Sequence, residues 1–424
     1  MSSPLDLDQA TMQRLGRTVA DHVAAHLAGL RQQRLFKSIS RAEAAALIPS
    51  APPAAGRDFA DLMGFLTERV FAHHTPEPHP GFLAYVQCCP TFPAVLGDWL
   101  ATGYNFFGGA WKVASGPAML EVTVLEWFRQ WIGMPAGTGG LLTSGGSTAN
   151  LMALVAARHR AVGEDPSRLA RLVVYSSTQG HSSVTRAAWI AGIPRSQVRA
   201  IAVDDQFRLR PDLLRQQIQV DRDAGLLPLA VVASAGTTNT GATDPLPALA
   251  ALCQAEQLWF HIDAAYGGFA AAVNESPAHP RGLSLADSVA VDPHKWLYAP
   301  LEAGCALVRD PEHLRAAFSY HPPYYHFEER ALNLVDYGPQ NSRGFRALKV
   351  WLALRHAGAD GYRRMIGDDI ALSRRMAEAV RREPELELAT QALSITTFRF
   401  VPADLAARAG EAKVAEHLEA LNRE

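Results

Sequence analysis

The chain has 424 residues, of which 48% are hydrophobic and 19% charged, and its formal net charge at pH 7 is −2. This length predicts two or three domains, and the near balance of charges argues against nucleic acid or an anionic membrane as a partner. The sequence shows no run of about 20 apolar residues to span a bilayer and no apolar signal core at its start, so we expect a cytoplasmic protein.

The four cysteines are Cys88, Cys89, Cys253 and Cys305. Their positions show neither the spacing of metal ligands nor a disulfide framework. We therefore expect reduced, mostly buried thiols and no metal site.

The first segment with helical periodicity covers residues 5–36, where Leu15, Val19, Val23 and Leu27 recur on one face. Such an amphipathic helix needs a partner surface. A second helix is predicted at 59–73, and the proline-rich stretch 74–81 follows it as a domain boundary. We expect an N-terminal helical segment over residues 1–80.

From residue 139 onward, short apolar runs alternate with helical segments. The predicted strands are 139–143, 171–176, 229–235, 258–262, 287–292 and 303–308, and helices such as 148–162, 211–224 and 246–256 separate them. This alternation predicts parallel strands joined by right-handed crossovers, hence an α/β fold with a mainly parallel sheet. Helices at 341–357 and 360–382, a strand at 394–400 and a last helix follow, so we expect a large domain over 81–355 and a small α/β domain over 356–424.

Ligands of such a sheet bind at the carboxyl ends of the strands, and the first candidate follows strand 139–143. Gly145 and Gly146 allow close backbone approach, and Ser147 lies where a helix begins. Free amides and the helix dipole would make an anion site there, although an ordinary helix cap after a glycine turn is the alternative. The sequence is neither a dinucleotide fingerprint nor a Walker loop.

Polar residues also follow the other strands. His181 could be a site residue or a helix cap, and the turn containing Thr238 could be a site or only a polar loop. Asp263 ends a strand among apolar neighbours and needs a partner. Lys295 stands between His294 and Trp296, where burial would disfavour its charged form and make it a nucleophilic amine.

Together these residues supply a lysine for a Schiff base, an acid for a pyridinium nitrogen, a flat imidazole and a phosphate cradle. Pyridoxal 5′-phosphate (PLP) requires these parts. We therefore predict that PLP is the cofactor.

The runs HPGFLAYVQ, TSGGSTANLMALVAAR, GHSSV, HIDAAYGG and DPHKW, in this order and spacing, resemble the group II PLP-dependent decarboxylases. They are most similar to the aromatic-L-amino-acid decarboxylase branch, over about residues 1–420. The resemblance implies PLP fold type I, the aspartate-aminotransferase type. It also implies a homodimer whose N-terminal helices, here within residues 1–80, wrap around the partner.

By matching position, the resemblance implies that Lys295 carries the cofactor, that Asp263 pairs with the pyridine nitrogen, and that His181 stacks on the ring face. The remaining cofactor contacts implied in this way are Gly145, Gly146, Ser147, Thr238, Ala265, Asp292 and His294.

The loop 320–330 matches the catalytic loop of the family. There Tyr324 falls on the tyrosine that returns a proton to the substrate carbon after CO2 leaves. Tyr325 is adjacent, so the register could slip by one, and Tyr324 could also be only a surface aromatic.

The chain departs from the family pattern in three places. Ala118 and Met119 replace a Thr-Glu pair beside the substrate pocket, and Gln87, Cys88 and Gly109 replace residues that line it. The family also continues with further strands, so we expect a shortened small domain in which the strand 394–400 is poorly paired.

We therefore predict a carboxy-lyase that converts an L-amino acid, with an aromatic side chain as in Dopa, tyrosine, tryptophan or phenylalanine, into the amine and CO2. Three alternatives stay open. The enzyme could couple decarboxylation to oxidative deamination and release an aldehyde, or it could accept a non-aromatic amino acid. It could also be an inactive paralogue that only binds PLP or another subunit.

Overall fold

The computed structural model describes residues 6–86, 89–273, 280–322 and 331–423. The chain forms two compact units, which meet in sequence between Cys89 and Pro90, whereas the sequence indicated a boundary at residue 80. The further division of the second unit near residue 355 stays a prediction. None of the described helices is long and apolar enough to cross a lipid bilayer.

The first unit is helical. It contains α1 (Gln9–Ala28), α2 (Arg41–Leu47) and α3 (Phe59–Phe65), followed by short irregular turns to residue 73. Asp8 caps α1, and Ser40 and Glu43 form a reciprocal capping box at the start of α2. No residue of α1 is buried, so its apolar stripe remains available to a partner surface.

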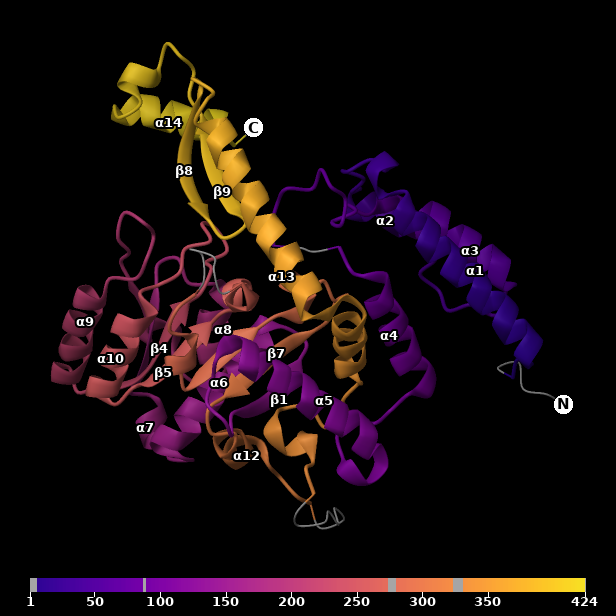
Figure 1. Cartoon of the computed structure of the whole chain (residues 1–424), viewed down its shortest axis with the longest axis horizontal. Helices are drawn as coiled ribbons and strands as arrows, with labels where there is room; N and C mark the ends of the chain where they lie inside the picture. Colours follow the sequence, from indigo (N-terminus) through magenta and orange to yellow (C-terminus); the bar gives the residue numbers. More distant parts are fainter. Residues whose placement is uncertain (1–5, 87–88, 274–279, 323–330, 424) are drawn as a thin grey trace. The chain divides into compact units, whose positions relative to one another are not determined.

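A seven-stranded sheet forms the centre of the second unit (Figure 1). Its strands are β1 (Gly139–Thr143), β2 (Leu172–Ser177), β3 (Val198–Ile201), β4 (Leu227–Ser234), β5 (Trp259–Asp263), β6 (Ser288–Val291) and β7 (Gly304–Val308). They lie in the order β1-β7-β6-β5-β4-β2-β3, and β2 to β6 pair in parallel.

Two features of the sheet differ from the prediction. β7 runs antiparallel to both of its neighbours, because residues 292–303 contain only the one-turn helix α11 (Pro293–Trp296), which is too short for a crossover. β3 was not predicted, since only Ile201 of its four residues is buried.

The helices of this unit pack on the sheet through small and apolar side chains. Ala149, Ala153, Ala156 and Ala157 of α6 (Gly146–Val162) are at most 1% exposed, so this helix lies close to β4–β7. Strands are also contacted by α5 (Trp111–Ile132), α9 (Pro211–Asp223) and α10 (Leu246–Glu256). The helices α7 (Pro166–Leu169), α8 (Ser182–Ile190) and α12 (Glu312–Phe318) contact α6.

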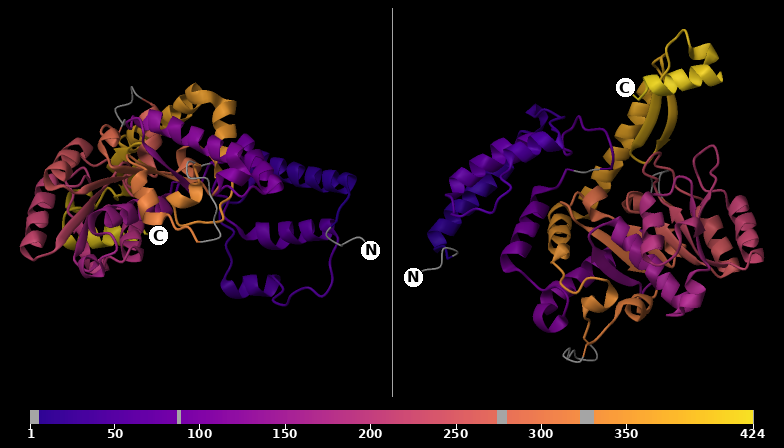
Figure 2. Two further views of the ribbon diagram at one scale, coloured as in Figure 1. Left: turned by 90° about the horizontal axis from the view of Figure 1, so that it is seen from below. Right: turned by 180° about the vertical axis from the view of Figure 1, so that it is seen from behind.

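The long helix α13 (Arg346–Val380) leads to the C-terminal elements (Figures 1 and 2). It breaks at Gly358, whose positive φ of 71° separates the two helices that the sequence predicted. β8 (Leu386–Ala392) and β9 (Ile395–Phe400) then form an antiparallel hairpin, and α14 (Ala412–Leu421) packs on it. The expectation that residues 394–400 are poorly paired is therefore wrong, because the missed strand β8 pairs with them.

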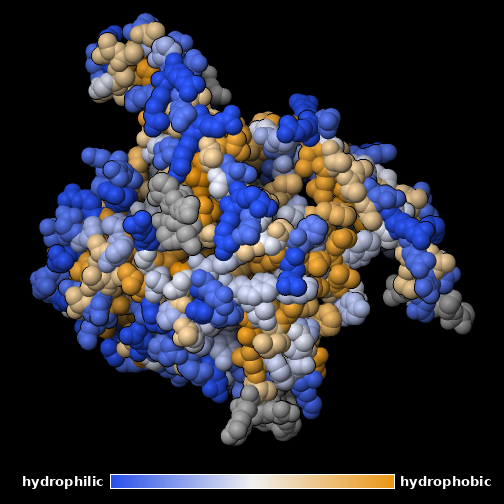
Figure 3. Space-filling model, in the orientation of Figure 1, coloured by the Kyte–Doolittle hydropathy of each residue, from blue (hydrophilic) through white to orange (hydrophobic). Residues whose placement is uncertain are grey.

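Helix α4 (Phe92–Tyr104) was also missed by the sequence analysis. It packs on α13 through Gly97, where a side chain would meet the backbone of Lys349 at 2.6 Å. Its other side leaves Trp99, Leu100 and Tyr104 between 47% and 72% exposed. Figure 3 shows hydrophobic side chains on the surface over this helix.

Candidate functional site

A cavity of about 390 Å³ lies at the carboxyl edge of the sheet, within the second unit. Residues that follow β1, β2, β4, β5 and β6 meet there. All the cofactor contacts inferred from the sequence line it, namely Gly145, Gly146, Ser147, His181, Thr238, Asp263, Ala265, Asp292, His294 and Lys295. Tyr324, Tyr325, Gln87 and Cys88 lie outside the described residues, so the role of Tyr324 stays a prediction.

One end of the cavity is built by the start of α6. A Cβ on Gly146 would lie 2.9 Å from the Ala265 Cβ and 3.1 Å from the Asp292 Oδ2, so only glycine fits here. The Thr148 hydroxyl contacts that of Ser144 at 2.8 Å. The first amides of the helix and its dipole therefore make an anion site in the cavity wall.

A charged group lies next to this anion site. The Lys295 Nζ is 3.0 Å from the Asp292 Oδ2, and the lysine side chain keeps 24% exposure. Burial raises the pKa of Asp292 above its ordinary value of 3.8, while Lys295 acts against this shift. The sequence suggested a desolvated amine, and the structure instead gives Lys295 a buried carboxyl partner.

His294 completes this side of the cavity. Its Nδ1 accepts a hydrogen bond from the Ala303 amide at 3.1 Å, and its Nε2 is 3.5 Å from the Asp292 Oδ2. Burial lowers the pKa of His294, which favours the neutral ring. A neutral imidazole with Nδ1 occupied as an acceptor carries its proton on Nε2 and can donate it.

The other end of the cavity holds Asp263, which is 9% exposed. Its Oδ2 accepts a hydrogen bond from the Asn150 amide at 2.8 Å, and its Oδ1 accepts one from the Ala265 N–H at 3.2 Å. Both oxygens of this side chain thus accept a hydrogen bond, which fixes its orientation.

His181 begins α8, and its Nδ1 accepts the Ser183 backbone N–H at 3.2 Å. The Ser183 hydroxyl lies 2.7 Å from the same nitrogen and itself accepts from Asn150 at 3.0 Å. The hydroxyl must therefore donate to Nδ1, which leaves the His181 proton on Nε2.

Asn150, Ser183, His261 and Ser288 are polar residues of this region that the sequence analysis did not select. A signal for two of them was present. His261 precedes Asp263 by two residues in a strand, and Asn150 follows Gly146 by four residues in a helix, so each pair shares a face. Both residues escaped notice in the sequence because their neighbours in the chain are mostly apolar.

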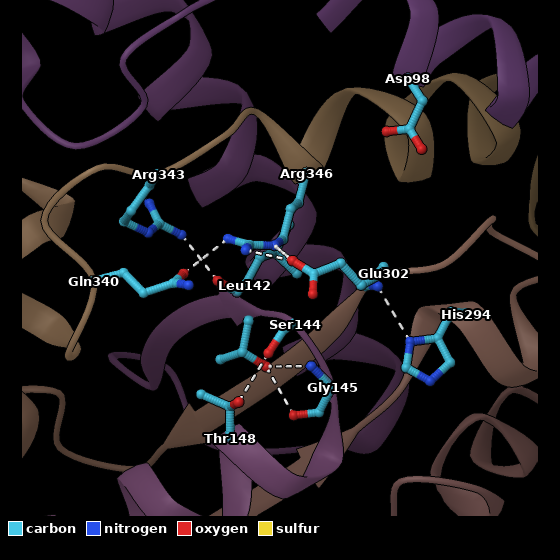
Figure 4. A network of polar contacts seen from close by, with 12 residues as sticks. Asp98, Leu142, Ser144, Gly145, Thr148, His294, Glu302, Gln340, Arg343 and Arg346 are labelled. Carbon is cyan, nitrogen blue, oxygen red and sulfur yellow. Dashed lines mark hydrogen bonds and ion pairs between the residues drawn. The ribbon is translucent and has the colours of Figure 1, made fainter. Parts of the chain in front are cut away.

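Glu302 also lines the cavity, and Figure 4 shows its side chain directed toward Arg346. Its carboxylate accepts a hydrogen bond from Arg346 at 2.6 Å, and Arg346 also reaches Gln340 at 3.1 Å. Nearby, the fully buried Arg343 donates to Glu121 at 2.7 Å and to the Leu142 carbonyl at 2.9 Å. Arg343 thus holds the loop before α13 against β1, and Arg346 connects the start of α13 to the loop before β7.

The residues present fit PLP. An amine, a carboxylate and an anion site line one cavity, as a pyridine ring with a carbonyl carbon and a phosphate would require. Among the described residues, the Asp292 Oδ1 is buried without a hydrogen-bond partner. A ligand group that donates a hydrogen bond would satisfy this oxygen.

Comparisons with known proteins agree with this fit. The model of the pyridoxal-dependent decarboxylase conserved domain matches residues 42–401. The chain is 36% identical to an aromatic-L-amino-acid decarboxylase of Bacillus atrophaeus, over 96% of this chain and 85% of that protein. It is 29% identical to a phenylacetaldehyde synthase of Arabidopsis thaliana, over 94% and 84% respectively.

Among solved structures, that of Oryza sativa TDC with PLP and tryptamine superposes with a TM-score of 0.93 at 28% identity. The match covers 99% of this chain and 89% of that one. The predicted mainly parallel α/β fold of PLP fold type I is confirmed.

Proposed function

Because the chain belongs to the pyridoxal-dependent decarboxylase family and is a PLP-dependent amino-acid decarboxylase, we propose that it converts an aromatic L-amino acid into the amine and CO2. The observation that carries this proposal is the cavity in which Lys295, Asp263 and the α6 anion site face one space. The aromatic side chain is supported by the name of the Bacillus relative and by the tryptamine in the rice structure.

When bound, PLP supplies an electron sink for the bond between the substrate carbon and its carboxylate. Lys295 is the nucleophilic amine of the cavity and must lose a proton before it bonds to carbon. Asp292 lies 3.0 Å from that amine and can accept the proton. Asp263 would hold a proton at the ring nitrogen, and the start of α6 would bind the phosphate.

A second candidate product is favoured by one finding, the similarity to a phenylacetaldehyde synthase. An acid that protonates the substrate carbon after CO2 leaves directs the reaction to the amine, an effect typically worth roughly 10²–10⁴-fold. Without that proton, O2 can intercept the carbon and give an aldehyde, ammonia and peroxide. We assign the acid to Tyr324.

The proposal is tested by incubating the PLP-loaded protein with a panel of L-amino acids and measuring CO2, amine and aldehyde. We expect aromatic substrates to react fastest and the amine to exceed the aldehyde. Replacing the phenol in Tyr324→Phe should lower amine formation by roughly 10²-fold and raise the share of aldehyde, while Tyr325→Phe serves as the matched control.

Each part of this proposal has an outcome that contradicts it. Fastest CO2 release from an aliphatic or acidic amino acid contradicts the aromatic assignment, and aldehyde as the main product of the unmodified protein contradicts the amine assignment. If Tyr325→Phe shifts the ratio of amine to aldehyde and Tyr324→Phe does not, the acid is Tyr325 and not Tyr324.

We also propose that the chain forms a homodimer. In the first unit, no residue of the amphipathic helix α1 is buried. In the second unit, Leu96, Trp99, Leu100 and Tyr104 border an apolar hollow on α4. A monomer rarely leaves such apolar surfaces in water, so a second copy is the partner that fits them.

A further inference from the structure

A chain of polar side chains runs through the apolar core behind Asp263. The Trp259 indole N–H donates to the Ser288 hydroxyl at 2.8 Å, and this hydroxyl lies 2.8 Å from the His261 Nδ1. The His261 Nε2 lies 2.9 Å from the Asn150 Oδ1. The Asn150 amide nitrogen then donates to Asp263. His261, Asn150 and Ser288 are each at most 1% exposed.

The direction of each hydrogen bond follows from the groups at the two ends. Asn150 uses its two N–H bonds for Asp263 and Ser183, so its oxygen must accept from His261. Burial lowers the pKa of His261 to about 4, so the ring is neutral at pH 7 and has one N–H, on Nε2. On the neutral ring the His261 Nδ1 accepts from the nearer Ser288 hydroxyl at 2.8 Å, whose oxygen accepts from Trp259. The Ser288 carbonyl, 3.2 Å from the same nitrogen, can only accept and then forms no hydrogen bond with it.

Every donor in this chain therefore points toward the Asp263 carboxylate. Hydrogen bonds in a buried row polarise one another, so each donor strengthens the next. The row ends at the Asp263 Oδ2, which accepts from the Asn150 amide at 2.8 Å.

Building on the proposed function, we propose that Asn150 and His261 are positioning residues that fix the orientation of the Asp263 carboxyl group and so set the strength of its contact with the cofactor's ring nitrogen. Neither residue lies in the set inferred from the sequence. Asn150 acts directly on the carboxylate, and His261 acts through Asn150.

The test measures how tightly the cofactor-free protein binds two ligands. These are PLP and its 1-deaza analogue, in which carbon replaces the ring nitrogen. Only PLP can bond to Asp263 through that position. We expect Asn150→Leu to weaken PLP binding by roughly tenfold, the usual scale for a hydrogen bond to a charged group. Binding of the analogue should change by less than about twofold, because it gains nothing from the orientation of Asp263.

Two substitutions of His261, one of which keeps a side-chain N–H, extend the same binding measurement. His261→Leu should lower the preference for PLP over the analogue, whereas His261→Gln should largely restore it, because the glutamine amide can place an N–H near the lost Nε2. Asn333→Leu is a matched control, since Asn333 is buried yet bonds only to the Trp111 amide and the Ala331 carbonyl among the contacts that the structure gives it. It should leave the preference unchanged.

The outcomes separate this inference from the proposed function. Equal weakening of both ligands in Asn150→Leu, or equal behaviour of His261→Gln and His261→Leu, overturns the positioning role while the enzyme remains a PLP decarboxylase. If the unmodified protein binds PLP and its analogue equally, Asp263 makes no ring-nitrogen contact and the inference is wrong. An unmodified protein that binds neither ligand contradicts the proposed function itself.

Discussion

The two carboxyl groups of the cavity, Asp263 and Asp292, are buried to a similar degree, with 9% and 2% exposure, yet their surroundings differ. Asp263 accepts hydrogen bonds on both oxygens from neutral donors, the Asn150 amide and the Ala265 N–H. Asp292 contacts a cation, Lys295, on one oxygen and has no hydrogen-bond partner on the other among the described residues.

This difference separates two tasks that a PLP site sets for its acids. A carboxyl group that is to contact a ring nitrogen needs a fixed orientation, and two neutral donors give Asp263 this orientation without a competing cation. A carboxyl group beside the lysine and the phosphate must instead gain and lose a proton. Burial supports that task at Asp292, because it raises the pKa of this group.

The largest loss of activity is expected from substitutions of Asp263. In the proposed arrangement Asp263→Ala removes the carboxyl group that contacts the ring nitrogen, so decarboxylation should fall by roughly 10²–10³-fold, as when one electrostatic contact to a transition state is lost. PLP should still bind through Lys295 and the α6 anion site. Asp263→Glu should retain more activity, because it keeps the charge in a displaced position.

The measurement is the rate of CO2 release, together with the absorbance of bound PLP. A fully active Asp263→Ala protein would show that the carboxylate has no electronic role. The comparison between the two acids would then lose its basis.

A smaller effect is expected at Asp292 and concerns stability against pH. Because the pKa of this carboxyl is raised in the folded protein, its favourable contribution is complete below about pH 3.8 and is lost as the pH rises through the folded value. Asp292→Asn cannot ionise, so without cofactor it should gain stability relative to the unmodified protein as the pH rises above 3.8. The gain should be on the order of 1 kcal/mol.

Calorimetric unfolding of both proteins between about pH 4 and 8 checks this. Asp263→Asn is the matched comparison, and it should lose stability because an amide nitrogen would replace an accepting oxygen at the Asn150 or Ala265 donor. If the difference in stability between Asp292→Asn and the unmodified protein does not change with pH, folding does not raise the pKa of Asp292.

The sequence predicted the strands and the site best where local signals repeat. Short apolar runs separated by helices marked six of the seven strands, and the polar residues after them meet in the cavity. The direction of β7 could not be read in this way, since it depends on how the chain returns after Lys295. β8 was missed because its residues alternate weakly and none of them is buried.

Asn150 and His261 show a different limit. A polar residue inside an apolar run shows that something must satisfy it, but not which distant group does so. The Asn150 Oδ1 and the His261 Nε2 come together across 111 residues of sequence, and only the packing of α6 on β5 makes that contact.

We propose that Lys295 carries PLP in a cavity where Asp263 faces the ring nitrogen. The most direct measurement is borohydride reduction of the PLP-loaded protein, followed by mass spectrometry of its peptides. We predict that the cofactor mass is found on Lys295 alone, and that Lys295→Ala is colourless and releases no CO2. A label on another lysine, or a Lys295→Ala protein that still decarboxylates at the original rate, would contradict the account.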